Sequence, residues 1–162
     1  MAKVGILMGS KSDFDVVKPA ISALKKMGIE TEVRVISAHR TPEEAHDFAA
    51  NAKANGMEVI ICAAGKAAHL GGVVAALTTL PVIGLPVKTD MMGGLDSLLS
   101  IVQMPAGIPV ATVGVNAGEN AGLLAAQILG IKYPEIAAGL QAYKAAMKEK
   151  INADDKALQE LL

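Results

Sequence analysis

Short apolar runs alternate with longer amphipathic stretches along the whole chain, and this alternation constrains the possible folds more than any other feature of the sequence. The apolar runs are nearly continuous, as in strands of a parallel sheet that helices cover on both faces. Such runs separated by helical stretches are typical of βαβ units. The pattern therefore predicts an α/β protein with a central parallel sheet, whose strands we place at residues 3–8, 32–36, 58–62, 82–85 and 110–113.

The stretches between the strands repeat apolar residues at the spacing of amphipathic helices. Pro19 lies inside the first stretch and predicts a kink or a late start, because proline lacks the N–H that a helix interior needs. The second helix has a clearer start, since Thr41 can cap it, Pro42 suits its first position and Glu44 is placed for a capping box. The predicted helices span residues 13–27, 41–54, 67–77, 95–103, 117–129 and 135–150.

We expect the 162 residues to form a single domain, because the chain has no internal repeat, linker or low-complexity tract. Residues 1–130 contain all the predicted strands and form the expected core. Residues 131–162 add the last helix and a further short amphipathic segment at 154–162. A sheet that is already covered does not need these C-terminal helices. We therefore expect them to form an arm that packs onto another subunit.

Composition excludes several classes of protein. Hydrophobic residues make up 52% of the chain and charged residues 19%, which excludes a disordered protein. The formal net charge is −1 and no basic or aromatic-rich stretch occurs, so nucleic acid is not an expected partner. No apolar stretch reaches the roughly 18 residues of a membrane span, and the first residues do not resemble a signal peptide. We therefore expect a soluble, cytoplasmic protein without a membrane partner.

The three histidines and the single cysteine are scattered and show no metal-ligand spacing, so we expect no bound metal. Cys62 ends a predicted buried strand and has no adjacent base. Core packing is therefore expected for its thiol, rather than a nucleophilic role or a disulfide. His46 lies beside Asp47 on a predicted outer helix, and we expect it to face solvent.

In open α/β sheets, ligands bind at the carboxyl ends of the strands, so the loops that follow the predicted strands are the expected places for chemistry. The first loop, MGSKSD, contains Gly9 for a tight turn and the hydroxyls of Ser10 and Ser12 before a helix N-terminus. This combination suits an anion such as phosphate. The alternative is that these residues only cap an ordinary helix, and this loop by itself leaves both interpretations open.

The second loop, SAHRT, places an imidazole beside a guanidinium. Arg40 could hold the same phosphate through paired hydrogen bonds. His39 would reach the same cleft, and an imidazole with an ordinary pKa of about 6.5 can transfer a proton near neutral pH. The alternative is a surface pair that merely precedes a capped helix.

The third loop, AAGKAAHLGG, has small residues that allow a backbone to approach a ligand closely. His69 falls in this stretch, and from the residues alone we favour a packed or hydrogen-bonded structural histidine over a site residue. The loop after the fourth strand contains Met91-Met92-Gly93-Gly94, which is typical of a mobile segment.

Taken together, these motifs resemble a known enzyme family. MGSKSD, SAHRTP, AAHL, GLDSLLSIVQMP and NAGLLAAQIL follow one another as in class I N5-carboxyaminoimidazole ribonucleotide (N5-CAIR) mutases. These enzymes belong to the aminoimidazole ribonucleotide (AIR) carboxylase family of purine biosynthesis. The resemblance extends from about Val4 to Ile151.

The resemblance implies a flavodoxin-like three-layer α/β/α sandwich that assembles as a homo-octamer, with active sites at subunit boundaries. It implies an isomerase that moves a carboxylate from the exocyclic nitrogen of N5-CAIR to ring carbon 4, with no metal or cofactor. His39 is then the catalytic acid and base. The implied substrate-binding residues are Ser10, Ser12, Asp13, Ser37 and Arg40, with a carboxylate pocket lined by Gly65, Lys66, Ala67, Ala68, His69 and Leu70.

One residue departs from the class I pattern. Lys66 stands where class I members usually carry a small residue, and class II relatives carry a basic residue near this position. Class II enzymes carboxylate AIR directly with CO2, so this reaction is the alternative function. We favour the mutase because SAHRTP and AAHL are class I features. A non-enzymatic, flavodoxin-like module for a flavin or nucleotide is a further alternative, but aromatic residues make up only 2% of the chain.

Overall fold

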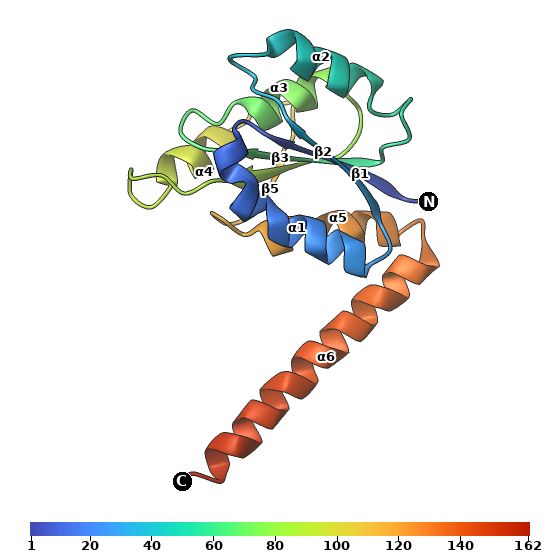
Figure 1. The fold of residues 1–162 in the computed structure, drawn as a ribbon, viewed down its shortest axis with the longest axis vertical. Coiled ribbons are helices and arrows are strands. Elements are labelled where there is room, and N and C mark those ends of the chain that lie inside the picture. The colour runs from blue at the N-terminus through green and yellow to red at the C-terminus, as the bar shows by residue number, and fades with distance from the viewer.

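The predicted strands are all present in the computed structural model, which describes all 162 residues, and they form one parallel sheet. The spatial order is β2-β1-β3-β4-β5, so the chain begins in the middle of the sheet and reverses its direction of growth after β2 (Figure 1). This is the flavodoxin-like order, as the resemblance implied. The strands are β1 (Lys3–Met8), β2 (Glu30–Val35), β3 (Val59–Ala64), β4 (Val82–Pro86) and β5 (Ala111–Thr112).

Helices cover both faces of the sheet and complete the three layers (Figure 1). One face carries α1 (Phe14–Lys26) and α5 (Gly118–Gly130). The other carries α2 (Pro42–Asn51), α3 (Leu70–Leu77) and α4 (Leu95–Val102). Each face has its own apolar core, because successive residues of a strand point to opposite sides of the sheet.

The burial of β3 on both faces of the sheet explains why its sequence is continuously apolar. Its six residues are all buried: Val59, Ile61 and Ala63 belong to the core beneath α1 and α5, while Ile60, Cys62 and Ala64 belong to the opposite core. Cys62 is therefore a core residue, as predicted. Burial raises the pKa of its thiol, which keeps it protonated and unreactive.

Small residues bring α1 and α5 into close contact. Ala121 and Ala125 are fully buried on the inner face of α5. A Cβ atom on Gly122 would lie 2.7 Å from the carbonyl oxygen of Ala20 and 3.0 Å from Cβ of Ala23. The two backbones are thus too close for a larger side chain, and the small residues of α5 serve close helix packing.

Several predicted boundaries were wrong. β2 begins two residues earlier than expected, and β5, at the edge of the sheet, is reduced to Ala111–Thr112. α3 starts at Leu70 rather than at residue 67, and Lys66, just before the predicted start, adopts a left-handed φ of 60°. A late start of α1 was also wrong, since the helix runs from Phe14 through Pro19. Pro19 lies on the exposed side of α1, where the carbonyl group that loses its partner can bond to water.

The C-terminal region also differs from the prediction. Instead of two segments, a single 26-residue helix, α6 (Pro134–Gln159), projects from the body of the molecule (Figure 1). No glycine or proline interrupts the sequence between residues 140 and 162, so nothing ends the helix early. Its first turns pack against α5, and Ile136 is its only buried residue. None of the helices combines the length and the apolar character needed to cross a membrane.

The start of α6 is fastened to the sheet by one carboxylate. Glu58, just before β3, accepts hydrogen bonds from Lys132 Nζ and Tyr133 Oη, both at 2.7 Å. Partial burial raises the pKa of Glu58, but the bonds from Lys132 and Tyr133 outweigh it and lower the pKa overall. This cluster lies at the end of the sheet opposite the carboxyl ends of the strands.

Candidate active site

A cleft of about 670 Å³ opens at the carboxyl ends of the central strands. The strand ends are level there, because Met8 pairs with Val35 of β2 and with Ala63 of β3. Backbone bonds continue just past the strands, with Gly9 N donating to Ala63 O at 3.2 Å and Val87 N donating to Ala64 O at 2.9 Å. The loops after β1, β2, β3 and β4 therefore leave the sheet side by side and line one cleft.

The loop after β2 is a closed turn between Ser37 and Thr41. Ser37 N donates to Thr41 Oγ1 at 3.0 Å, and Thr41 N donates to Ser37 O at 2.9 Å. The Thr41 hydroxyl is engaged in this turn, so it makes no capping bond, and the predicted cap and capping box at α2 were wrong. Pro42 does occupy the first helical position. The turn presents His39 and its two neighbours to the cleft.

Arg40 joins the second loop to the first. Its Nη2 donates to Gly9 O at 2.7 Å, and its Nε donates to Ser37 Oγ at 3.4 Å. These two bonds hold the guanidinium across the gap between the β1 and β2 loops. Since a guanidinium has five N–H donors, most of them remain available to an anion in the cleft.

The loop after β1 forms a short 3₁₀ turn, Lys11–Asp13, that concentrates hydroxyl groups. Ser10 Oγ accepts bonds from Ser12 N at 3.3 Å and from Ser12 Oγ at 2.9 Å, and Ser12 Oγ also lies 3.3 Å from Asp13 Oδ1. Burial raises the pKa of Asp13, and bonds from Ser12 and Ser10 and the charge of Arg40 only partly offset this. Ser10 caps this short turn, which runs directly into α1, while Asp13 at the start of α1 makes no capping bond.

The loop after β3 is held from behind by α4. Ser97 is fully buried, and its Oγ accepts a bond from Lys66 N at 2.9 Å. Ser100 Oγ donates to Lys66 O at 3.2 Å. These bonds maintain the left-handed backbone of Lys66 and leave Gly65, Lys66 and Ala67 lining the cleft. Ala68 does not line it, contrary to the prediction, because its side chain is buried in the core beneath α2 and α3.

His39 and His69 meet across the cleft. Nε2 of His39 lies 2.8 Å from Nδ1 of His69, and the two rings are nearly perpendicular, at 76°, with centroids 4.9 Å apart. His69 comes directly before α3 and is exposed, so of the two structural roles expected from the residues alone it is not packed but hydrogen-bonded. The cleft thus contains two imidazoles in direct hydrogen-bonding contact.

Residues 87–90, after β4, also line the cleft and were missing from the predicted site. Ligands bind at the carboxyl ends of the strands in such sheets, and this rule, applied to the loop after β4, would have identified these residues. Lys88 and Asp90 are the charged members of this segment, and Lys88 N is held by Asn116 Oδ1 at 2.8 Å. The charged side chains around the cleft are three cations and two carboxylates: Arg40, Lys66 and Lys88, with Asp13 and Asp90.

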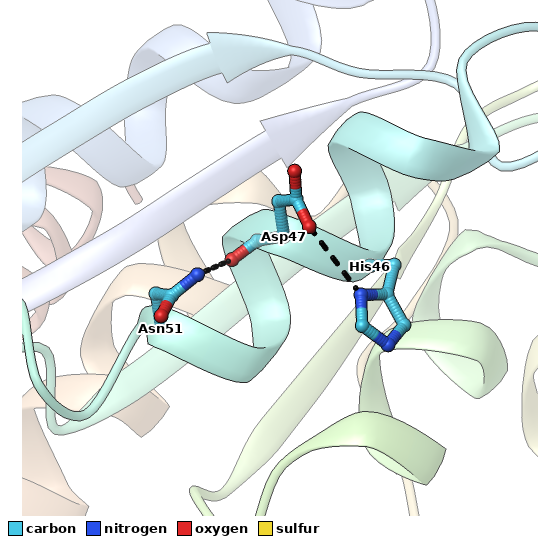
Figure 2. A network of polar contacts seen from close by, with 3 residues as sticks. All are labelled: His46, Asp47 and Asn51. Atoms are coloured by element: carbon cyan, nitrogen blue, oxygen red, sulfur yellow. Dashed lines mark hydrogen bonds and ion pairs between the residues drawn. The ribbon is translucent and has the colours of Figure 1, made fainter.

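The third histidine lies elsewhere. His46 is on the outer side of α2, where Nδ1 contacts Asp47 Oδ1 at 3.5 Å, while Asn51 Nδ2 donates to the Asp47 carbonyl group at 2.8 Å (Figure 2). The side chains of His46 and Asp47 are 62% and 79% exposed. The prediction that His46 faces solvent is therefore confirmed. The structure contains no cluster of three or more His, Cys, Asp or Glu side chains that could hold a metal ion.

Replacing Asp13 with asparagine tests the electrostatics of the first loop. The raised pKa means that the folded state binds more protons than the unfolded state above pH 3.8, so the parent loses stability as the pH rises. We therefore expect the unfolding temperature of Asp13→Asn, measured relative to that of the parent, to rise as the pH is raised from 4 to 7. Asp15→Asn, in the first turn of α1, is the matched control and should lose stability, because its carboxylate favours the helix N-terminus. A relative loss for Asp13→Asn over this range would contradict the burial argument.

Comparison with known proteins agrees with this fold and shows the family. The sequence matches the family model of AIR carboxylase over residues 3–150. N5-carboxyaminoimidazole ribonucleotide mutase of Thermotoga maritima is 55% identical over 99% of this chain and 94% of its own length. The enzyme of that name from Mycobacterium tuberculosis is 52% identical over 98% of this chain and 91% of its own length. The crystal structure of Treponema denticola PurE is similar with a TM-score of 0.90, at 34% identity over 98% of this chain and 99% of that one. The chain belongs to the AIR carboxylase family.

Proposed function

We propose that this protein is an N5-CAIR mutase of purine biosynthesis, which moves the carboxylate from the exocyclic nitrogen of its substrate to ring carbon 4. The product is 4-carboxy-5-aminoimidazole ribonucleotide. The observation that carries the proposal is the placing of His39 and Arg40, which enter one cleft beside the hydroxyls of Ser10 and Ser12. Relatives that bear the mutase name cover nearly the whole chain at more than half identity, which supports the same reaction.

The first and second loops provide groups for the ribose phosphate. The hydroxyls of Ser10, Ser12 and Ser37 can donate to phosphate oxygens, and Arg40 adds charged N–H donors that its bonds to Gly9 and Ser37 hold in position. Asp13 is placed beside them, where a carboxylate can accept bonds from ribose hydroxyls. Binding of the remote phosphate and ribose holds the reacting ring in place.

His39 supplies the proton transfers. The C–N bond to the carboxylate breaks as the exocyclic nitrogen takes a proton from His39, releasing CO2 within the cleft. Ring carbon 4 then forms a C–C bond to that CO2, and the proton displaced from carbon 4 returns to His39. One proton leaves His39 and one returns, so the sequence of steps is balanced and needs no external acid or base.

The third loop provides the walls that retain CO2. Gly65, Ala67 and Leu70 present only small or apolar surface to the cleft, which suits a neutral, linear molecule. Lys66 and Lys88 lie at the same side and can attract the carboxylate of substrate or product. Lys66 is also the residue that suggested direct carboxylation of AIR.

We also propose that the protein acts in the cytoplasm as a homo-oligomer, an octamer by family resemblance. Most of α6 is exposed, and its exposed residues include Met147, Ile151 and Leu158. Beside it, residues of α5 and α6 line an apolar groove that contains Leu123, Leu124 and Leu140. A second copy of the chain that covers these surfaces would explain why residues 131–162 form an arm.

Replacing His39 tests the proposed chemistry. We expect His39→Asn to lower turnover of N5-CAIR at least about 100-fold, since a positioned acid and base contributes roughly that much or more. The oligomer and ligand binding should be preserved, because His39 is exposed in the cleft and supports no core contact. His46→Asn, on the outer side of α2, is the matched control and should keep full activity. Near-normal turnover by His39→Asn would exclude the catalytic assignment.

Shortening α6 tests the arm. We expect a chain that ends after Asn152 to form smaller assemblies, measured as a lower mass by light scattering, because it lacks the last apolar residues of the helix. In the full chain, Leu158→Ser should act in the same direction, while Lys156→Ser, on the same helix, should have little effect. An unchanged mass for both the shortened chain and Leu158→Ser would refute the arm.

A further inference from the structure

We infer that His69 is a positioning residue for His39: through the contact between their ring nitrogens, it fixes the orientation and tautomer of the His39 imidazole. This inference rests on the proposed function, because it assigns His69 a part in the same proton transfers. It replaces the simpler expectation that His69 only lines the carboxylate pocket.

The geometry requires the two rings to share one hydrogen. Nε2 of His39 and Nδ1 of His69 are 2.8 Å apart, which is the separation of a hydrogen bond and too close for two unprotonated nitrogens or two N–H groups to face one another. One ring must therefore donate and the other accept. The tautomer of His39 is thus coupled to that of His69.

This contact leaves His39 with one free nitrogen. Nε2 is engaged with His69, and Nδ1 has no hydrogen-bonding partner in the protein. In one arrangement His39 donates from Nε2 and exposes a basic Nδ1. In the other His69 donates, and His39 holds its hydrogen on Nδ1. With Nε2 donating its hydrogen to His69, the free Nδ1 of His39 gives up a proton when the ring is protonated and takes one back when the ring is neutral, so this one nitrogen serves as both the acid and the base that the reaction requires.

Charged side chains of both signs line the cleft that contains the pair. Arg40 is on the same loop as His39, Lys66 is on the loop of His69, and Lys88 faces them from the loop after β4. The two carboxylates of the cleft, Asp13 and Asp90, only partly balance these cations. The hydrogen bond between the rings needs one donor and one acceptor, so it is lost if both facing nitrogens carry hydrogen.

Two substitutions at His69 separate hydrogen bonding from bulk. Asparagine can place an amide group near the position of Nδ1 and keep the bond to His39, whereas leucine has similar size and cannot. We expect His69→Leu to lower kcat for N5-CAIR about tenfold to a hundredfold with KM little changed. We expect His69→Asn to keep kcat within about threefold of the parent. Equal losses in the two variants would overturn the inference.

A second measurement does not depend on activity. NMR spectra of protein carrying isotope-labelled histidine report the tautomer of each ring, and the His39 signals are identified by their loss in His39→Asn. We expect one His39 tautomer pattern in the parent and in His69→Asn, and a changed pattern in His69→Leu. An unchanged pattern in His69→Leu would overturn the inference. A changed pattern in His69→Leu, together with a parent protein that is inactive on N5-CAIR, would count only against the proposed function.

Discussion

The parallel register of the central strands is the constraint on which the rest of the site depends. β1 pairs with β2 on one side and β3 on the other, and Met8 is level with both Val35 and Ala63. Three loops that are distant in sequence therefore emerge at the same height, and the loop after β4 joins them. A shift of β2 by one residue would turn His39 and Arg40 away from the hydroxyls of the first loop. Positioning of the reactive groups is thus a consequence of backbone pairing.

Hydrogen bonds within and between the loops then fix the positions of the residues that the sheet brings together. The closed turn from Ser37 to Thr41 presents His39, and the bond from Arg40 to Gly9 ties this turn to the neighbouring loop. On the other side, buried Ser97 holds Lys66 in a left-handed conformation. Each side of the cleft is thereby held by hydrogen bonds from a separate element, which favours a preformed site. The proposed reaction depends on such preorganisation, because CO2 must remain next to ring carbon 4 while it is free.

The fold and most of the site could be predicted because they depend on local patterns. Continuous apolar runs identify buried parallel strands, and residues that follow such strands are brought to one edge of the sheet. The contact of His39 with His69 could not be predicted in this way, since it depends on the left-handed turn at Lys66 and on a buried serine of α4. The burial of Ala68 has the same origin. The length of α6 was missed because residues 135–150 and 154–162 were predicted as separate segments, although no helix-breaking residue lies between them.

The source of the transferred carboxylate tests the central claim most directly. N5-CAIR labelled with a carbon isotope in its carboxylate should be converted by the purified protein in buffer that contains excess unlabelled bicarbonate, and the label in the product should be measured by mass spectrometry. A mutase that holds CO2 in the cleft predicts that the product retains the label and that AIR with bicarbonate is a poor substrate. Loss of the label to the bicarbonate pool, together with efficient carboxylation of AIR, would contradict the account and identify a direct carboxylase.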